Sequence, residues 1–250
     1  METASLREQF VALFGARGGD ALARCAVPYE ASGESAVQRL AKSIDHTLLK
    51  PEATMEQVRL LCEEAKQFFV ASVCVNSTFV PLVTKSLQGS TVKVCSVVGF
   101  PLGAMSSKAK AYEAALAVEQ GADEIDMVIA LGLIKGGAWE RVEQDIAQVR
   151  TAISGKILKV ILETSLLTQE EKIFAALTAV LAKADFVKTS TGFADGGATL
   201  ADVSLLRETV GNAASVKASG GIRTRQEALA FLEAGADRIG ASQTKTILGL

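Results

Sequence analysis

The sequence has very little of what most catalytic metal or nucleophile sites require. Its 250 residues include one histidine, His46, so a catalytic metal held by a cluster of histidines is excluded. The four cysteines show no C-x-x-C spacing and suggest neither a zinc site nor a disulfide framework. A G-x-S-x-G nucleophile elbow is missing as well. An enzymatic function would therefore depend on other side chains.

Charge of one sign and long apolar runs are also scarce. The 26 basic and 28 acidic residues give a net charge of −2, which provides no field to attract nucleic acid or an anionic membrane. No apolar run is long enough to span a bilayer, and the first 20 residues lack the uninterrupted apolar region of a secretory signal. Apolar residues make up 49% and prolines number 4. We expect a compact cytoplasmic protein whose partner is a small metabolite.

From Ser43 onward, short apolar segments alternate with amphipathic ones. Eight segments have the composition of strands: SIDHT, ASVCVN, VKVCSVVGF, EIDMVI, ILKVILE, FVKTST, SVKASGG and RIGAS. Helical patterns between them include residues 55–69, 106–120, 140–153, 169–183 and 225–234. Eight such units favour an α/β fold of the TIM (β/α)8 barrel type. An open doubly wound sheet is the alternative, but its G-x-G-x-x-G turn is absent.

The start of the chain has a different pattern. Residues 1–40 combine helical spacing of apolar side chains with a stretch that contains glycine and proline, and they are predicted to form an N-terminal helical extension. Residues 41–250 are predicted to form the barrel domain. We expect the extension to serve packing or subunit contact, in a homodimer or a higher homo-oligomer.

Several predicted strands carry charged residues, although an unpaired ammonium group is costly to bury. Side chains alternate along a strand, so Lys188 shares one face of FVKTST with Phe186 and Ser190. The same alternation groups Asp45 with Thr47, Glu124 with Asp126, Lys159 with Ile161 and Glu163, and Ser215 with Lys217 and Ser219. The opposite faces are mostly apolar. We expect the polar set to line the barrel interior, as a reactive site or as a structural salt-bridge network, with His46 turned away from it.

Lysine chemistry remains available to this sequence. A lysine whose pKa is lowered by desolvation and by a neighbouring cation can attack a carbonyl carbon and form a Schiff base at neutral pH. Lys188 and Lys217 lie on successive parallel strands, close enough for one to lower the pKa of the other. Schiff-base formation on a lysine is therefore the favoured hypothesis.

Three predicted strands end in small residues: STG (190–192), SGGIR (219–223) and GAS (240–242). Backbone N–H groups in such turns can form an anion nest, and many TIM barrels bind phosphate after strands seven and eight. A single Gly-Gly pair is more often an ordinary turn, but its recurrence on the last two strands predicts a phosphate site. Arg223 could add positive charge there, or it could be solvated.

Taken in order along the chain, the predicted strands and the residues that follow them resemble those of the deoxyribose-phosphate aldolase family. The matching segments run from Ser43 to Ser242: SIDHTLLKP, VCVN, VVGFPLGA, DEIDMVI, KVILET, FVKTSTGF, VKASGGIR and RIGAS. Family members are class I aldolases with a TIM barrel. They reversibly cleave 2-deoxy-D-ribose 5-phosphate to acetaldehyde and D-glyceraldehyde 3-phosphate in deoxyribose catabolism. The resemblance implies a carbon–carbon lyase that binds sugar phosphate and aldehyde substrates and needs no metal or organic cofactor.

The resemblance also implies roles for individual residues. Lys188 would be the Schiff-base lysine, Lys217 the neighbour that lowers its pKa, and Asp126 the carboxylate that relays protons. Three further positions would line the sugar end of the pocket: Asp45, Thr47 and Lys159. The phosphate-binding positions would be Thr191, Gly192, Gly220, Gly221, Ile222, Arg223, Gly240, Ala241 and Ser242.

Two features depart from the family pattern. Gln243-Thr244-Lys245 follows GAS, where a second small residue is common, and no tyrosine lies near the end at Leu250. One alternative function is a Schiff-base aldolase for a ketose phosphate or an unphosphorylated aldehyde. The other is a non-catalytic sugar-phosphate binding protein. Cys74 is expected on the interior face, either as a small buried hydrophobe or as a thiol close to the pocket.

Overall fold

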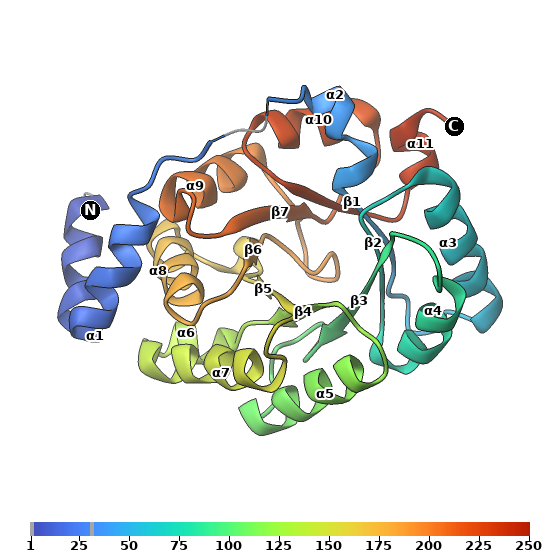
Figure 1. The fold of residues 1–250 in the computed structure, drawn as a ribbon. Coiled ribbons are helices and arrows are strands. Elements are labelled where there is room, and N and C mark those ends of the chain that lie inside the picture. Colours follow the sequence, from blue (N-terminus) through green and yellow to red (C-terminus); the bar gives the residue numbers. More distant parts are fainter. Residues whose placement is uncertain (1–2, 31–32) are drawn as a thin grey trace.

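A closed ring of parallel strands forms the centre of the molecule (Figure 1). The computed structural model describes residues 3–30 and 33–250. The strands are β1 (Ile44–Leu48), β2 (Ser72–Val75), β3 (Lys93–Val98), β4 (Glu124–Val128), β5 (Ile157–Ile161), β6 (Phe186–Lys188), β7 (Ser215–Ser219) and β8 (Arg238–Ala241). Each pairs with the next, and β8 pairs with β1. The predicted TIM barrel is confirmed, and every strand overlaps a predicted segment, with β1 extending one residue beyond its segment to Leu48.

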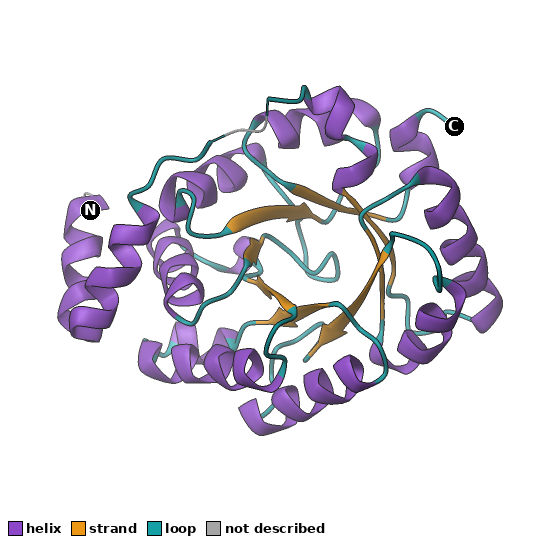
Figure 2. Ribbon diagram, in the orientation of Figure 1, coloured by secondary structure: helices purple, strands orange, loops and turns teal. Residues whose placement is uncertain are grey.

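Helices surround the strand ring on its outer side (Figure 2). They are α3 (Met55–Phe68), α4 (Val80–Ser86), α5 (Ser107–Glu119), α6 (Leu131–Lys135), α7 (Trp139–Ala152), α8 (Gln169–Leu181), α9 (Leu200–Val210), α10 (Arg225–Glu233) and α11 (Thr244–Leu248). Short 3-10 turns are η1 (Ala41–Ser43), η2 (Ser77–Phe79) and η3 (Thr164–Leu166). Capping boxes at Thr54, Thr168 and Thr224 explain where three helices begin, because each threonine satisfies an otherwise unpaired backbone N–H. In the described residues, no helix is long and apolar enough to cross a bilayer.

The two faces of the strands differ as the alternation predicts. Residues on the outer faces are fully buried against the helices, among them Ile44, Ile125, Met127, Leu158, Val160, Val216 and Ala218. These side chains belong to one apolar cluster between the sheet and the helix layer. The inner faces carry the charged residues, which are consequently enclosed by the barrel.

The extension packs on the helix layer. Helix α1 (Thr3–Cys25) contacts α8 and α9, and it bends at Gly15, which is not helical, into two pieces that lie side by side (Figure 1). The fully buried ring of Phe10 packs on Phe14 and on Phe174 of α8, with centroid distances of 4.8 and 5.5 Å. The short helix α2 (Ala36–Arg39) contacts α10. Residues 1–2 and 31–32 of the predicted extension lie outside the described residues.

Candidate active site

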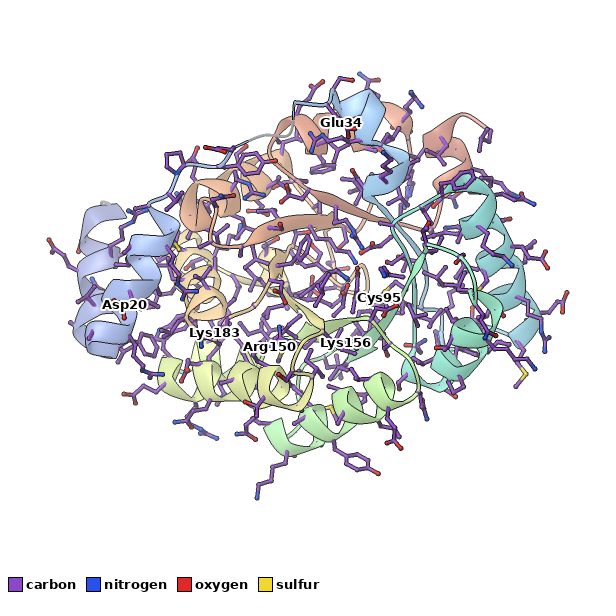
Figure 3. All side chains as sticks on the ribbon, viewed as in Figure 1. Asp20, Glu34, Cys95, Arg150, Lys156 and Lys183 are labelled. Carbon is purple, nitrogen blue, oxygen red and sulfur yellow. The ribbon has the colours of Figure 1, made fainter. Side chains whose placement is uncertain are left out.

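Asp126 on β4 lies at the centre of a group of buried charges. Its Oδ2 accepts hydrogen bonds from Lys188 Nζ at 2.8 Å and from Lys217 Nζ at 2.7 Å. Its Oδ1 accepts from Lys159 Nζ at 2.9 Å and from the Cys95 thiol at 3.2 Å. The sheet register produces this meeting, because Asp126 pairs with Lys159 and Lys188 with Lys217 in adjacent strands. Figure 3 shows Cys95 within the ring of strands.

A second group of charges lies at the strand starts. Arg238 of β8 donates to Asp45 Oδ1 at 2.6 Å and to Glu124 Oε2 at 2.9 Å, and Lys159 Nζ is 2.5 Å from the same Glu124 oxygen. The other oxygen of Asp45 lies 2.5 Å from Lys217 Nζ and so joins the two groups. The sequence reasoning did not single out Arg238. Its alternation with Gly240 in RIGA would have placed it on the inner face.

These contacts set the charge state of the cluster. Burial alone would raise the pKa of Asp126, but the ammonium groups of Lys159, Lys188 and Lys217 outweigh it and hold that pKa well below its ordinary value. Burial alone would lower the pKa of Lys217, but Asp126 and Asp45 raise it above its ordinary value. Asp126 therefore stays a carboxylate and Lys217 stays an ammonium group at neutral pH.

A pocket of about 420 Å³ opens above this cluster, at the C-terminal ends of β1, β6, β7 and β8. It is lined by Thr47, Leu48, Leu49, Lys50, Lys188, Thr191, Gly192, Phe193, Ser219, Gly220, Gly221, Ile222, Arg223, Gly240, Ala241 and Ser242. Of the three lysines on Asp126, Lys188 is the one that lines the pocket. Asp45 and Lys159, expected at the sugar end, are instead fully buried beneath it, where they bind Lys217 and Asp126.

The turns after β6 and β7 contribute glycine-rich backbone to the pocket lining. Gly192, Gly220 and Gly221 have φ values of 82°, 90° and 82°, a region that favours glycine. Several lining residues have backbone N–H groups without an acceptor in the part of the chain that the structure describes, among them Gly192, Gly221, Ile222 and Ser242. Unpaired amides beside a cavity form an anion nest. Exposed Lys50 and Arg223 add positive charge, and no carboxylate is among the described lining residues.

Glycine is also required for these turns to stack on one another. A Cβ atom on Gly197 would lie 2.5 Å from the carbonyl oxygen of Gly220. A Cβ on Gly240 would lie 2.8 Å from Ser219 Cβ and 3.2 Å from Lys217 Cε. These distances are shorter than ordinary contacts, so the loops after β6, β7 and β8 need glycine to reach the same pocket.

A family model of the DeoC/LacD family aldolases matches residues 39–248 of this sequence. The chain belongs to that family. It is 59% identical over 203 residues to a deoxyribose-phosphate aldolase of Finegoldia magna, which covers 81% of this chain and 95% of the relative. It is 56% identical over 210 residues to that of Streptococcus gordonii, with 84% and 96% covered. The resemblance found in the sequence is confirmed, and the protein is an aldolase, a carbon–carbon lyase.

Solved structures give the same fold. The tetrameric deoxyribose phosphate aldolase from Aeropyrum pernix superposes with a TM-score of 0.80 at 32% identity, over 100% of this chain and 97% of that one. A structure named "QR15, an Aldolase" has a TM-score of 0.81 at 38% identity, over 84% and 94%. The shared architecture therefore covers the whole barrel of this aldolase.

Beyond Ser242, the chain of the aldolase turns away from the pocket. Thr244 is buried, with its hydroxyl 2.8 Å from His46 Nδ1, while His46 Nε2 lies 3.1 Å from Glu64. Lys245 Nζ binds the same Glu64 at 2.7 Å. His46 is thus satisfied behind the strand, as predicted, and burial lowers its pKa. Neither Thr244 nor Lys245 is among the pocket-lining residues.

Two thiols lie beside the buried charges. Cys74 and Cys95 are Cα partners on β2 and β3, and their sulfur atoms and a carboxylate oxygen of Asp126 lie within 4.8 Å of one another. Ligand atoms at this spacing could hold a cation, but three ammonium groups already bind Asp126 and would repel one. Cys74 packs with Leu49 and Val97 in a small apolar cluster and does not line the pocket.

Several pocket residues were not singled out from the sequence. Leu48, Leu49 and Lys50 follow Thr47 directly, and Phe193 follows Gly192. Their position in the sequence could have identified them, because residues that follow the C-terminal ends of barrel strands border the active site. Lys50 is the informative omission, because it brings a second exposed cation to the rim of the pocket beside Arg223.

Proposed function

We propose that this aldolase reversibly cleaves 2-deoxy-D-ribose 5-phosphate to acetaldehyde and D-glyceraldehyde 3-phosphate through a Schiff base on Lys188. The observation that carries the proposal is the position of Lys188. It is held by Asp126 at 2.8 Å and borders a pocket whose glycine-rich turns offer unpaired amides to an anion. One pocket thus combines an amine for the carbonyl carbon with a nest for the phosphate.

The first stage joins the sugar to the enzyme. The neutral amine of Lys188 attacks C1 of the open-chain sugar, and loss of water gives a protonated imine. Lys217 binds the same Asp126 oxygen as Lys188 and keeps its positive charge beside the reacting amine, because Asp126 and Asp45 outweigh its burial and raise its pKa. The pKa of Asp126 is held low, so a proton that it receives from Lys188 is passed on to the carbinol oxygen, which leaves as water, and Asp126 stays a carboxylate.

The second stage breaks the carbon–carbon bond. The C3 hydroxyl gives its proton to water, with the Asp126 carboxylate beside Lys188 as the relay, and becomes a carbonyl. The electron pair of the C2–C3 bond moves into the protonated imine. Glyceraldehyde 3-phosphate leaves, and a two-carbon enamine remains on Lys188. Protonation of the enamine at C2 and hydrolysis release acetaldehyde and restore the amine. Every step is a proton transfer or an addition or elimination at carbon, so the scheme balances without a redox partner.

The pocket is matched to the two ends of such a substrate. The amides of Gly192, Gly221, Ile222 and Ser242 would hold the phosphate, with Lys50 and Arg223 at the rim. Thr47 lines the pocket at the end of β1 and would contact the sugar.

The setting of the reaction is part of the same proposal. We propose a role in deoxyribose catabolism and a cytoplasmic location, which suits four free cysteines. We also propose a homo-oligomer, because the relative from Aeropyrum pernix that shares this fold is tetrameric.

The test is to trap the imine. The protein is incubated with 2-deoxy-D-ribose 5-phosphate and sodium borohydride, and its intact mass is measured before peptide mapping. We expect one reduced adduct, on Lys188. Lys188→Met abolishes the adduct and turnover, whereas Lys108→Met, at an exposed lysine on α5, retains both. An adduct on another lysine, or none on folded wild-type protein, would contradict the proposal.

A further inference from the structure

Glu163 is a buried carboxylate that takes no part in the steps above. It follows β5 closely and has φ 56° and ψ 62°, a left-handed conformation that is uncommon for a residue with a side chain. Its side chain is buried, yet no cation binds it among the residues that the structure describes. Its carboxylate reaches across the end of β6 to Thr191. A buried charge held in this way needs hydrogen bonds to replace its hydration.

Thr191 supplies those hydrogen bonds. Its backbone N–H lies 3.3 Å from each oxygen of Glu163, and its hydroxyl donates a short hydrogen bond to Oε2. The same hydroxyl oxygen accepts from the backbone N–H of Phe193 at 3.1 Å. The backbone N–H groups of Thr191 and Phe193, on either side of Gly192, therefore already have acceptors. The Gly192 N–H is left without an acceptor among the described residues and is available to the pocket.

The turn rests on the chain around Glu163 in other ways as well. The backbone N–H groups of Leu162 and Thr164 donate to the carbonyls of Lys188 and Thr189, at 2.9 and 3.0 Å. A Cβ on Gly196 would lie 3.0 Å from Ser165 Cβ, so the loop after β6 lies closely on η3. The segment after β5 thus supports both the reactive lysine and the phosphate loop that follows it.

We infer that Glu163 is a positioning residue that holds the turn from Thr191 to Phe193 so that the Gly192 N–H faces the substrate phosphate. The inference rests on the proposed function, because it takes the bound anion to be the phosphate of the sugar. A carboxylate suits this role, since it accepts from the amide and the hydroxyl of Thr191 together. Glutamine would direct its own N–H groups at one of those two donors.

The test compares a phosphorylated with an unphosphorylated substrate. In Glu163→Gln we expect KM for 2-deoxy-D-ribose 5-phosphate to rise about tenfold or more, with kcat within about twofold. We expect kcat/KM for unphosphorylated 2-deoxy-D-ribose to stay unchanged, because that substrate does not use the nest. Glu143→Gln is the matched control. This buried carboxylate binds Arg17 on the outer helix layer, and its loss should leave both substrates unaffected.

Two variants of Thr191 test the inference even where the Glu163→Gln protein does not fold. Thr191→Val removes the hydroxyl and should raise KM for the phosphorylated sugar as Glu163→Gln does. Thr191→Ser keeps a hydroxyl at this position, so its KM should stay close to that of the wild type. The double variant Glu163→Gln/Thr191→Val should be no worse than the poorer single variant, because the two groups act as a unit. Loss of kcat/KM for both sugars alike, unchanged KM in Glu163→Gln, or additive losses in the double variant would overturn the inference.

Borohydride trapping separates this inference from the proposed function. If wild-type protein forms no adduct with either sugar, the proposed function fails and the inference fails with it. If wild type forms the adduct on Lys188 and Glu163→Gln keeps the wild-type preference for the phosphorylated sugar, the inference alone is overturned. An adduct with both sugars and a reduced preference in Glu163→Gln supports both.

Discussion

Lysine is buried in two places in this aldolase, and the two places differ in charge balance. Lys110 on α5 is fully buried and donates to Asp145 Oδ2 at 2.6 Å and to the carbonyl of Val128 at 3.0 Å. Lys110 and Asp145 thus form a single ion pair that is enclosed by the protein. Within the barrel, three ammonium groups bind Asp126, and Lys188 opens to a pocket. Burial with an ion pair is therefore common to Lys110 and Lys188, whereas Lys188, the lysine that we propose reacts, shares its carboxylate with two other ammonium groups and borders a cavity.

The largest effect is expected from removing the charge beside the reactive lysine. Lys217→Met removes the second cation on Asp126 Oδ2, so the carboxylate binds Lys188 alone and holds its amine more strongly against attack on the carbonyl carbon. We expect kcat at pH 7 to fall by about 10²–10⁴, the range for general acid–base groups. Circular dichroism should show an intact fold. Near-wild-type kcat at pH 7 would contradict this reason.

At the buried ion pair of Lys110 and Asp145 we expect a loss of stability without a loss of activity. Lys110→Met leaves Asp145 as an unpaired buried carboxylate, which costs about 3–5 kcal/mol of unfolding free energy. Urea denaturation measures the loss, and kcat of the folded fraction should stay at the wild-type value. Replacing both partners in Lys110→Met/Asp145→Leu should recover much of the stability. A large drop in kcat with unchanged stability would remove the distinction between the two lysines.

Acid should destabilise the barrel through its own carboxylates. The pKa values of Asp126 and Asp45 are lowered, by the three lysines on Asp126 and by Arg238 and Lys217 on Asp45, although burial opposes both shifts. A lowered folded-state pKa contributes stability above the unfolded value of about 4, and that stability is lost as pH falls below it. Urea unfolding should therefore give a lower free energy at pH 3 than at pH 5, by more than about 1.4 kcal/mol. Equal values at the two pH values would contradict the strong coupling inside the barrel.

The smallest effect is expected at the exposed rim of the pocket. Lys50→Met removes a solvated cation, so KM for the sugar phosphate should rise by about fivefold or less at low salt. The difference should shrink at high salt, because the screening length falls to about 3 Å near 1 M. Steady-state kinetics at two salt concentrations measure it, with Lys108→Met as the control. A tenfold or larger, salt-independent effect would mean that Lys50 is a buried contact of the bound substrate.

The barrel and its charged interior could be predicted from the sequence, because strand alternation has a fixed period of two. That rule alone was sufficient to group Lys159, Lys188 and Lys217 with Asp126. Helix boundaries agreed within two residues at each end for the five helices named from the sequence, including α3 and α8. Capping residues and apolar periodicity are local signals, so they can be recognised without knowledge of tertiary contacts.

The features of the site that were not predicted lie mostly where the chain leaves regular structure or depend on tertiary packing. Glu163 was assigned to the inner face by continuing the alternation from Lys159, but β5 ends at Ile161 and the left-handed turn redirects the side chain. Arg238 was overlooked, although its alternation with Gly240 in the four residues of β8 is the same signal that identified Lys188 in the three residues of β6. Lys110 has the sequence position of a surface lysine on a helix. Its burial follows from the packing of α5 on α7, which no local pattern encodes.

The backbone amides of the pocket have a consequence for how this enzyme can change. In the proposed phosphate site the donors are main-chain N–H groups, which every residue except proline supplies. Exposed positions on these loops can therefore vary while the anion is still bound, provided that the path of the chain is kept. A change of that path would alter the substrate preference, through insertion, deletion, loss of a glycine at Gly192, Gly220 or Gly221, or loss of the side-chain contacts that hold the turn at Thr191.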